Sequence, residues 1–214
     1  MTDVIGIYGA SGFGREVLPL VREQYSSVEL VFIDDGFQSD NLNGYKVLSF
    51  DDFLEVEATS KKLTVAIADS KIREAVTKKC EERNLPIINI SASNVVILDE
   101  VEIGQGSILC PFVTVTSNVQ IGKSFHANIY SYVAHDCVIG DYVTFAPRVH
   151  CNGNIHIDDF AYIGTGAVIK QGSPDKPLKI GKGAIVGMGA VVTKDVPAGT
   201  IVIGNPAKPL ERKS

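Results

Sequence analysis

The sequence predicts two domains: a small α/β, Rossmann-like domain over residues 1–90 and an all-β parallel β-helix over residues 91–214, with one external loop. Three observations lead to this fold class. The first half begins with an apolar run, a glycine-rich turn and a helical pattern. The second half repeats an aliphatic residue every six positions, and a polar insert interrupts that repeat once.

The six-residue repeat identifies the β-helix. A hexapeptide period is typical of coils that are closed by three short flat faces. The repeat misses only at two small residues, Ala127 and Cys151, and residues eighteen apart, such as Ile103, Ile121 and Ile139, should stack in one column. The repeat positions are Ile97, Ile103, Leu109, Val115, Ile121, Val133, Ile139, Phe145, Ile157, Ile163 and Ile169.

The single interruption predicts the external loop. Eleven residues separate Ile169 from Ile180, where six or twelve would keep the phase of the repeat. The intervening segment is polar and rich in Gly and Pro. Keeping it inside the coil would turn the following inward side chains outward, so it must bulge from the solenoid. We place this loop near residues 171–179.

The first domain begins with a pattern typical of nucleotide-binding folds. An apolar strand over residues 4–8 leads into the turn Gly9-Ala10-Ser11-Gly12 and then into a helical pattern. A second apolar run ends in Asp34-Asp35, about twenty residues further on, where doubly wound folds place an acidic residue. The glycine spacing is not the full dinucleotide fingerprint, so we do not expect NAD binding.

Three further elements complete the predicted domain. Residues 63–68 read as a strand, residues 70–83 as a helix with Ser70 as its N-cap, and residues 86–90 as a short fourth strand.

Composition excludes several functions. The formal net charge is −5 and the pI is near 5.4, so the basic footprint of a nucleic-acid-binding or membrane-surface protein is missing. No apolar segment is long enough for a membrane span and no signal pattern begins the chain, so we expect a cytoplasmic protein. The cysteines have no metal-ligand spacing and are expected to be reduced core residues; they are Cys80, Cys110, Cys137 and Cys151.

Several motifs together resemble a known family. They are Tyr8–Gly12, Phe32–Asp35, the hexapeptide repeat, Ala134–Gly140 and Val202–Lys208. This set is similar to the bacterial sugar acetyltransferases of the left-handed β-helix superfamily, in the branch with an N-terminal nucleotide-sugar domain. That branch includes N-acetyltransferases of UDP- or GDP-linked 4-amino-4,6-dideoxy sugars and sialic-acid O-acetyltransferases. Left-handedness is implied by the resemblance alone, because parallel crossovers are generally right-handed.

The leading catalytic candidate is His135. It stands two residues after the inward Val133, so its imidazole should project from a corner of the coil, with Asp136 beside it. Acyl transfer to an amine needs a base, and a carboxylate on one ring nitrogen fixes the tautomer of the other. In the resembling enzymes a His here is the general base and the next acidic residue supports it. The other histidines, His126, His150 and His156, are expected to be surface residues without a catalytic role.

The resemblance also implies acetyl-CoA as cosubstrate, bound along a groove between subunits of a homotrimer. Gly153 matches a glycine whose N–H faces the thioester oxygen. Thr144 stands where relatives often have a second His, and Lys208 is a candidate for a CoA phosphate. Ala167 and Gly187 are placed in the groove by their coils. No metal is expected.

For the sugar nucleotide, Gly9, Ser11 and Gly12 allow backbone approach to a diphosphate. Asp34 or Asp35 is the candidate acceptor of hydrogen bonds from a base or ribose. The remaining two candidates are Asn128, which matches an asparagine beside the acceptor amine, and Asp69, which follows the third predicted strand.

We therefore predict an acetyl-CoA-dependent N-acetyltransferase acting on the C4 amine of a nucleotide-linked 4-amino-4,6-dideoxy sugar, in lipopolysaccharide, other surface polysaccharide or glycan synthesis. The first alternative is a sialic-acid O-acetyltransferase. The second is a non-catalytic trimeric scaffold whose first domain senses a nucleotide. The sequence leaves the choice among UDP, GDP and dTDP open, because carboxylates accept from more than one base.

Overall fold

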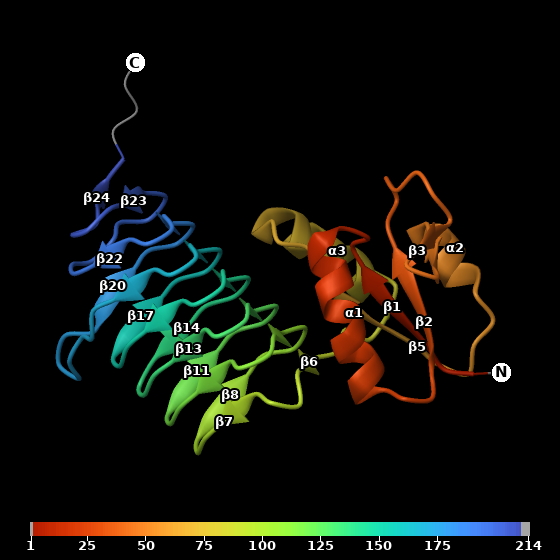
Figure 1. Ribbon diagram of the computed structural model, residues 1–214, viewed down its shortest axis with the longest axis horizontal. Coiled ribbons are helices and arrows are strands. Elements are labelled where there is room, and N and C mark those ends of the chain that lie inside the picture. Colours follow the sequence, from red (N-terminus) through yellow and green to blue (C-terminus); the bar gives the residue numbers. More distant parts are fainter. Residues whose placement is uncertain (1, 211–214) are drawn as a thin grey trace. The chain divides into compact units, whose positions relative to one another are not determined.

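The computed structural model describes residues 2–210. The chain divides into two compact units, Met1–Ser93 and Asn94–Ser214, each of which is described by itself (Figure 1).

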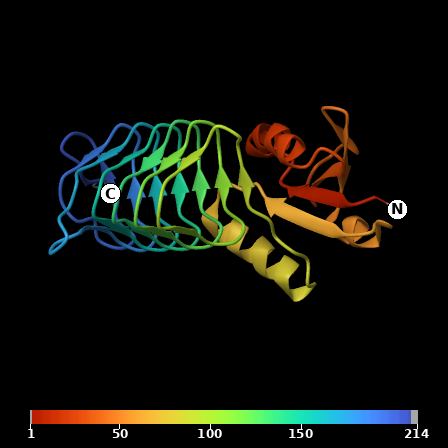
Figure 2. The same cartoon turned by 90° about the horizontal axis from the view of Figure 1, so that it is seen from below.

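The first unit is an α/β domain around a parallel sheet of order β3-β4-β2-β1-β5, in which only the β3–β4 pair is antiparallel. The central strand β1 is buried along its whole length, and Figure 2 shows α1 and α3 on opposite faces of the sheet. The elements are β1 (Val4–Tyr8), α1 (Gly12–Gln24), β2 (Glu29–Ile33), β3 (Asn41–Leu42), β4 (Tyr45–Leu48), α2 (Phe50–Glu55), β5 (Lys61–Val65), α3 (Ser70–Glu82) and β6 (Ile90–Ser91).

The structure corrects two details of this domain. The N-cap of α3 is Asp69 and not Ser70, because the Asp69 carboxylate accepts hydrogen bonds from the N–H groups of Lys71 and Ile72, at 2.9 and 3.0 Å. The predicted fourth strand is reduced to a single bridge between Leu63 and Ile87. The sequence pattern also missed the β3–β4 hairpin and α2, which are too short to give a clear period.

The second unit is a parallel β-helix whose coils supply strands to three sheets, seen as stacked rungs in Figure 2. The first sheet has the order β22-β19-β16-β13-β10-β7, the second β20-β17-β14-β11-β8, and the third contains β24-β23-β21-β18-β15-β12-β9. The strands are β7 (Val96–Ile97), β8 (Val101–Ile103), β9 (Ile108–Leu109), β10 (Thr114–Val115), β11 (Val119–Ile121), β12 (His126–Ala127), β13 (Tyr132–Val133), β14 (Val138–Ile139), β15 (Thr144–Phe145), β16 (His150–Cys151), β17 (Ile155–Ile157), β18 (Tyr162–Ile163), β19 (Val168–Ile169), β20 (Leu178–Ile180), β21 (Ile185–Val186), β22 (Val191–Val192), β23 (Ile201–Ile203) and β24 (Lys208–Pro209).

The predicted column of repeat residues is confirmed by the strand register. Ile121 pairs with Ile103 on one side and with Ile139 on the other, and the column continues through Ile157. These side chains point into the coil and belong to one apolar core, together with Cys137, Cys151 and Ala167 among others. The core is built mainly from small and aliphatic residues, with Phe125 and Phe145 as its two aromatic members.

The external loop leaves the coil between β19 and β20 (Figure 1). Beyond it the register resumes, because Ile180 pairs with Ile157 as the next member of the same column. Within the loop, Ser173 and Lys176 form an antiparallel bridge. The insert is therefore accommodated outside the coil, as its phase shift predicts.

Candidate active site

His135 and Asp136 form a hydrogen-bonded pair at the corner between β13 and β14. The Nδ1 of His135 lies 2.7 Å from Oδ2 of Asp136, and Asn118 on the preceding coil donates to Oδ1 at 3.3 Å. Asp136 adopts a left-handed φ of 56°, which brings its short side chain back toward its neighbour. The hydrogen bond with His135 holds the pKa of the Asp136 carboxyl below its usual range, so the carboxylate is ionised at neutral pH.

Gly153 lies directly against the imidazole of His135. It occupies the same corner one coil later, where the N–H of Asn154 donates to the carbonyl of His135 at 3.0 Å. A Cβ at Gly153 would stand 2.5 Å from both Cε1 and Nε2 of the ring. Only glycine fits here without moving the histidine, and its backbone is thereby exposed to the edge of the ring.

A second set of contacts holds the peptide between Asn152 and Gly153. The hydroxyl of Tyr132 donates to Oδ1 of Asn152 at 2.8 Å, and Nδ2 of Asn152 donates to the carbonyl of Ile169 at 2.7 Å. From the core side, the Cys137 thiol donates to the carbonyl of Asn152 at 3.1 Å. Sequence reasoning missed Tyr132 and Asn152, although both flank corner positions next to His135 and Gly153.

All four cysteines are buried and none forms a disulfide, in agreement with the prediction of reduced core residues. A hydrogen bond with Cys137 and burial together raise the pKa of the Cys151 thiol, so Cys151 stays protonated at neutral pH. Within residues 2–210 no group of three His, Cys, Asp or Glu side chains is arranged to hold a metal ion.

The other predicted residues of the β-helix lie away from this corner. Asn128 and Gly187 lie at the corner that follows the third sheet, where Nδ2 of Asn128 donates to the carbonyl of Phe145 at 3.1 Å. Thr144 is buried on β15, and Lys208 is exposed on β24. Within a single chain, these residues therefore do not lie next to His135.

Two predictions about side-chain position are wrong. Ala167 does not face the groove: its side chain is fully buried in the core, and its backbone N–H and carbonyl are bonded to Gly164 and His150. His126 is not a surface residue but is fully buried, since it lies in register between Ile108 and Thr144, which are themselves buried.

In the first unit, the glycine-rich turn between β1 and α1 is tightly built. Gly9 has a φ of +115°, and a Cβ there would lie 2.8 Å from the carbonyl oxygen of Ala66. Asp34 stabilises the turn, because Oδ2 accepts from the N–H of Ala10 at 2.9 Å. Ser11 is the N-cap of α1, and its hydroxyl makes no capping hydrogen bond. With Gly12 as its first residue, α1 directs its N-terminal amides toward this turn.

Asp35 belongs to a separate cluster on the same edge of the sheet. It accepts from the Tyr8 hydroxyl at 2.8 Å, from the backbone N–H of Phe50 at 2.8 Å and from Lys79 at 3.2 Å. Burial raises its pKa, but these three donors outweigh burial and hold the pKa below its usual range. Tyr8, Asp35 and Lys79 line an open pocket of about 440 Å³ with the apolar face of α3. Asp69 lies apart from this cluster and caps α3.

Comparisons with known proteins agree with the motifs. The PglD N-terminal domain family matches residues 4–80. The GDP-perosamine N-acetyltransferase of Escherichia coli O157:H7 is 52% identical over 215 residues, which cover 98% of this chain and 97% of the relative. The chain belongs to the hexapeptide-repeat sugar N-acetyltransferases.

Solved structures of this family share the whole fold. WeeI from Acinetobacter baumannii AYE is 65% identical, with a TM-score of 0.96 over 98% of this chain and 100% of that one. The acetyltransferase domain of PglB from Neisseria gonorrhoeae FA1090, in complex with acetyl coenzyme A, is 29% identical, with a TM-score of 0.89 over 98% and 100%. The β-helix of this sugar N-acetyltransferase is accordingly left-handed, as the family resemblance implies. Within residues 2–210, no helix has the length and apolar character required to cross a bilayer.

Proposed function

We propose that this protein transfers the acetyl group of acetyl-CoA to the C4 amine of a nucleotide-linked 4-amino-4,6-dideoxy sugar. The observation that carries this proposal is the arrangement of His135, Asp136 and Gly153 at one corner of the β-helix. GDP-perosamine is the first acceptor to test, because the relative that is 52% identical over nearly the whole chain is a GDP-perosamine N-acetyltransferase.

His135 acts as the general base. Its Nδ1–H is donated to the ionised Asp136, which leaves the lone pair of Nε2 free to accept a proton. The amine nitrogen attacks the thioester carbonyl and loses its proton to Nε2 as the tetrahedral species forms. When that species collapses, the C–S bond breaks, CoA leaves as a thiolate that takes up the proton, and the amide is the product.

Gly153 supplies the N–H that stabilises the negative oxygen of the tetrahedral species. Its close approach to the imidazole supports this assignment, because the base and the oxyanion donor must face the same carbonyl carbon. A preorganised donor of this kind contributes about 3 kcal/mol to transition-state stabilisation. The contacts of Tyr132, Asn152 and Cys137 hold this peptide in place.

The first domain binds the nucleotide. The turn Gly9–Gly12 at the N-terminus of α1 is suited to a diphosphate, since helix N-termini attract anions. The nearby pocket of Tyr8, Asp35 and Lys79 offers a carboxylate, a hydroxyl and an ammonium group for the base or ribose. Asp34 contributes indirectly, because it holds the backbone of the turn.

The active form is a homotrimer in the cytoplasm, and its product enters surface polysaccharide or glycan synthesis. Two observations support assembly. Asn128 and Gly187 lie at a different corner from His135, so a second subunit is needed to bring both corners to one substrate. That other corner also exposes large apolar side chains, among which the rings of Phe112 and Tyr130 stack with centroids 4.7 Å apart.

The test is an acetylation assay with acetyl-CoA and GDP-perosamine, together with UDP- and dTDP-linked 4-amino-4,6-dideoxy sugars. Free and CMP-linked sialic acid serve as acceptors for the O-acetyltransferase alternative. Turnover of an amino sugar supports the proposal and assigns the nucleotide. Turnover of sialic acid alone, or no acetyl-CoA binding as expected of a scaffold, contradicts it.

A further inference from the structure

Cys137 lies on the core side of the corner that carries His135. Its side chain is buried, and its Sγ lies 3.1 Å from the carbonyl oxygen of Asn152 and 3.6 Å from that of His135. The two carbonyls belong to successive coils, since Cys151, which precedes Asn152, pairs with Val133. One buried thiol therefore contacts the backbone of the proposed base and the backbone beside the proposed oxyanion donor.

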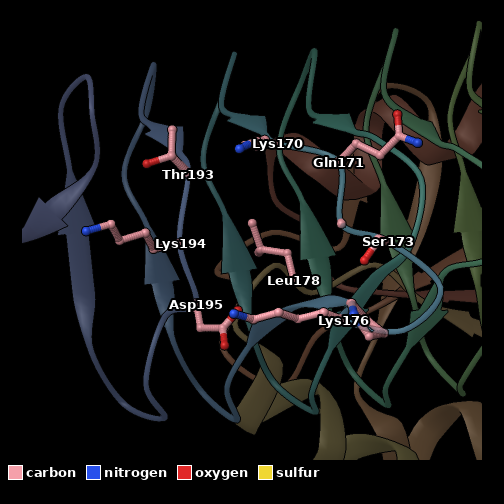
Figure 3. Close-up of a pocket in the computed structure, with 10 residues that line it drawn as sticks. Lys170, Gln171, Ser173, Lys176, Leu178, Thr193, Lys194 and Asp195 are labelled. Carbon is pink, nitrogen blue, oxygen red and sulfur yellow. The ribbon is translucent and has the colours of Figure 1, made fainter.

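Cys137 also departs from the pattern of its own row. This row contains the inward residue at the start of the second sheet on each coil, and the strand register aligns its members. Figure 3 shows Leu178, a member of the row, among the residues that line the pocket beside the external loop. On five successive coils the members are Val101, Val119, Cys137, Ile155 and Leu178. Four of these are aliphatic, so packing does not explain why a hydrogen-bond donor stands on the coil of His135.

The acceptor of that donor is one half of the peptide group that matters most. The carbonyl of Asn152 and the N–H of Gly153 belong to the same peptide, and in a planar trans peptide they point in opposite directions. The Cys137 thiol holds the carbonyl toward the core, so the N–H points outward, to the side on which the His135 imidazole lies. A hydrogen bond to the carbonyl also polarises the peptide, which strengthens the N–H as a donor.

Other contacts fix the backbone around this peptide but not the peptide itself. The N–H of Asn154 donates to the carbonyl of His135 at 3.0 Å, and the carbonyl of Gly153 accepts from the N–H of Gly172 at 3.0 Å. The hydroxyl of Tyr132 acts on the side chain of Asn152. The thiol of Cys137 acts directly on the Asn152 carbonyl.

We infer that Cys137 is a positioning residue whose thiol hydrogen aims and polarises the Gly153 N–H toward the negative oxygen of the tetrahedral species. The inference rests on the proposed function and deepens it, because it assigns the hydrogen of the thiol, and not its bulk, to catalysis. That oxygen becomes negative only as the transition state forms. The contribution of Cys137 therefore belongs to kcat and not to KM for either substrate.

Two substitutions separate the donor from the packing. Cys137→Val makes the row aliphatic and removes the donor, whereas Cys137→Ser keeps a donor and buries a hydroxyl. We expect kcat to fall about fivefold in Cys137→Val, with both KM values unchanged, and to stay within about twofold of the original in Cys137→Ser. Thermal stability should follow the opposite order, because valine suits this row and a hydroxyl is costly to bury.

Two further measurements serve as controls. Val101→Cys places a thiol in the same row two coils earlier, away from Gly153, so it should leave kcat unchanged and should not rescue Cys137→Val when the two are combined. The acid limb of the pH profile of kcat/KM should also stay in place in Cys137→Val, because the pair of His135 and Asp136 keeps its own hydrogen bond.

A kcat for Cys137→Val within about twofold of the original, or a kcat for Cys137→Ser as low as that of Cys137→Val, overturns the inference. A shifted acid limb in Cys137→Val also overturns it, because the loss would then come from a displaced His135. If the unsubstituted protein transfers no acetyl group at all, the proposed function fails. That outcome is distinct from an active enzyme in which the substitutions at Cys137 have no effect.

Discussion

Gly153 and the imidazole of His135 occupy adjacent coils at such close range that a methyl group on Gly153 would lie 2.5 Å from two ring atoms. The coil repeat explains this contact. Residues eighteen apart stack at one corner, and the residue one coil after His135 must be small because the imidazole lies directly against it. In the proposed mechanism the same glycine presents its N–H to the negative oxygen of the tetrahedral species, while the histidine takes the proton from the amine.

Gly153→Ala should abolish most of the activity without unfolding the protein. The added methyl group must displace the His135 ring, and a shift of about 1 Å in a catalytic group costs on the order of a hundredfold in rate. Steady-state kinetics and thermal unfolding measure the two effects. Gly183→Asn is the matched control, because Gly183 has a φ of +64° and nothing lies within 4 Å of its Cβ position. Equal activity in both variants would contradict the assignment.

Asp136→Asn should lower kcat by about a hundredfold or more while leaving KM nearly unchanged. An amide can donate to Nδ1, which would place the ring proton on Nε2 and remove the base. In the unsubstituted protein, the hydrogen bond with His135 lowers the pKa of Asp136, so the carboxylate is available from neutral pH down to that lowered pKa. Kinetics at neutral pH provide the measurement, and a kcat within about twofold of the original would refute the role of Asp136.

Tyr132→Phe should reduce kcat by about fivefold, since one hydrogen bond that positions Asn152 and Gly153 is lost at a net cost near 1 kcal/mol. The change removes only the hydroxyl that donates to Asn152. Asn152→Asp, which keeps the acceptor oxygen, should retain more activity than Asn152→Ala. A loss confined to thermal stability, with kcat unchanged, would make this contact purely structural.

Asp35→Asn should destabilise the first domain at neutral pH but not at low pH. The pKa of Asp35 is lowered in the folded state, so its contribution is present above the unfolded value of about 3.9 and is lost as pH falls through the lowered folded value. The carboxyl is half exposed, which limits the effect to on the order of 1 kcal/mol. Thermal unfolding at pH 7 and at pH 3 would measure it, and an equal loss at both values would exclude the ionised carboxyl as its source.

The sequence predicted the β-helix well because its coils impose a period on the chain. The column through Ile121 and the loop after Ile169 both follow from counting residues. Contacts between side chains on neighbouring coils are harder to predict from the sequence. The Tyr132–Asn152 hydrogen bond joins residues on neighbouring coils at positions with no inward constraint, so no periodic signal marks it.

Local chemistry accounts for the predictions that were wrong. Asp69 displaced Ser70 as N-cap because its carboxylate accepts from two amides of α3. Ala167 was placed in the groove by its coil, but its position in the repeat is inward, and the core holds its side chain. His126 stands on an outward row that its neighbours bury. The first two outcomes follow from residues close in sequence and from the repeat itself, whereas the burial of His126 depends on neighbours in space that the sequence pattern does not reveal.

The central claim is that His135 deprotonates an amine of a nucleotide-linked sugar during acetyl transfer. The most direct measurement is the mass and acetylation position of the product formed from acetyl-CoA and GDP-perosamine, or its UDP- or dTDP-linked counterparts, with the unsubstituted protein and with His135→Ala. The account predicts a single N-acetyl group at C4 and a rate lower by about a hundredfold to ten-thousandfold in the variant. Acetylation at a hydroxyl, or an undiminished rate in His135→Ala, would contradict it.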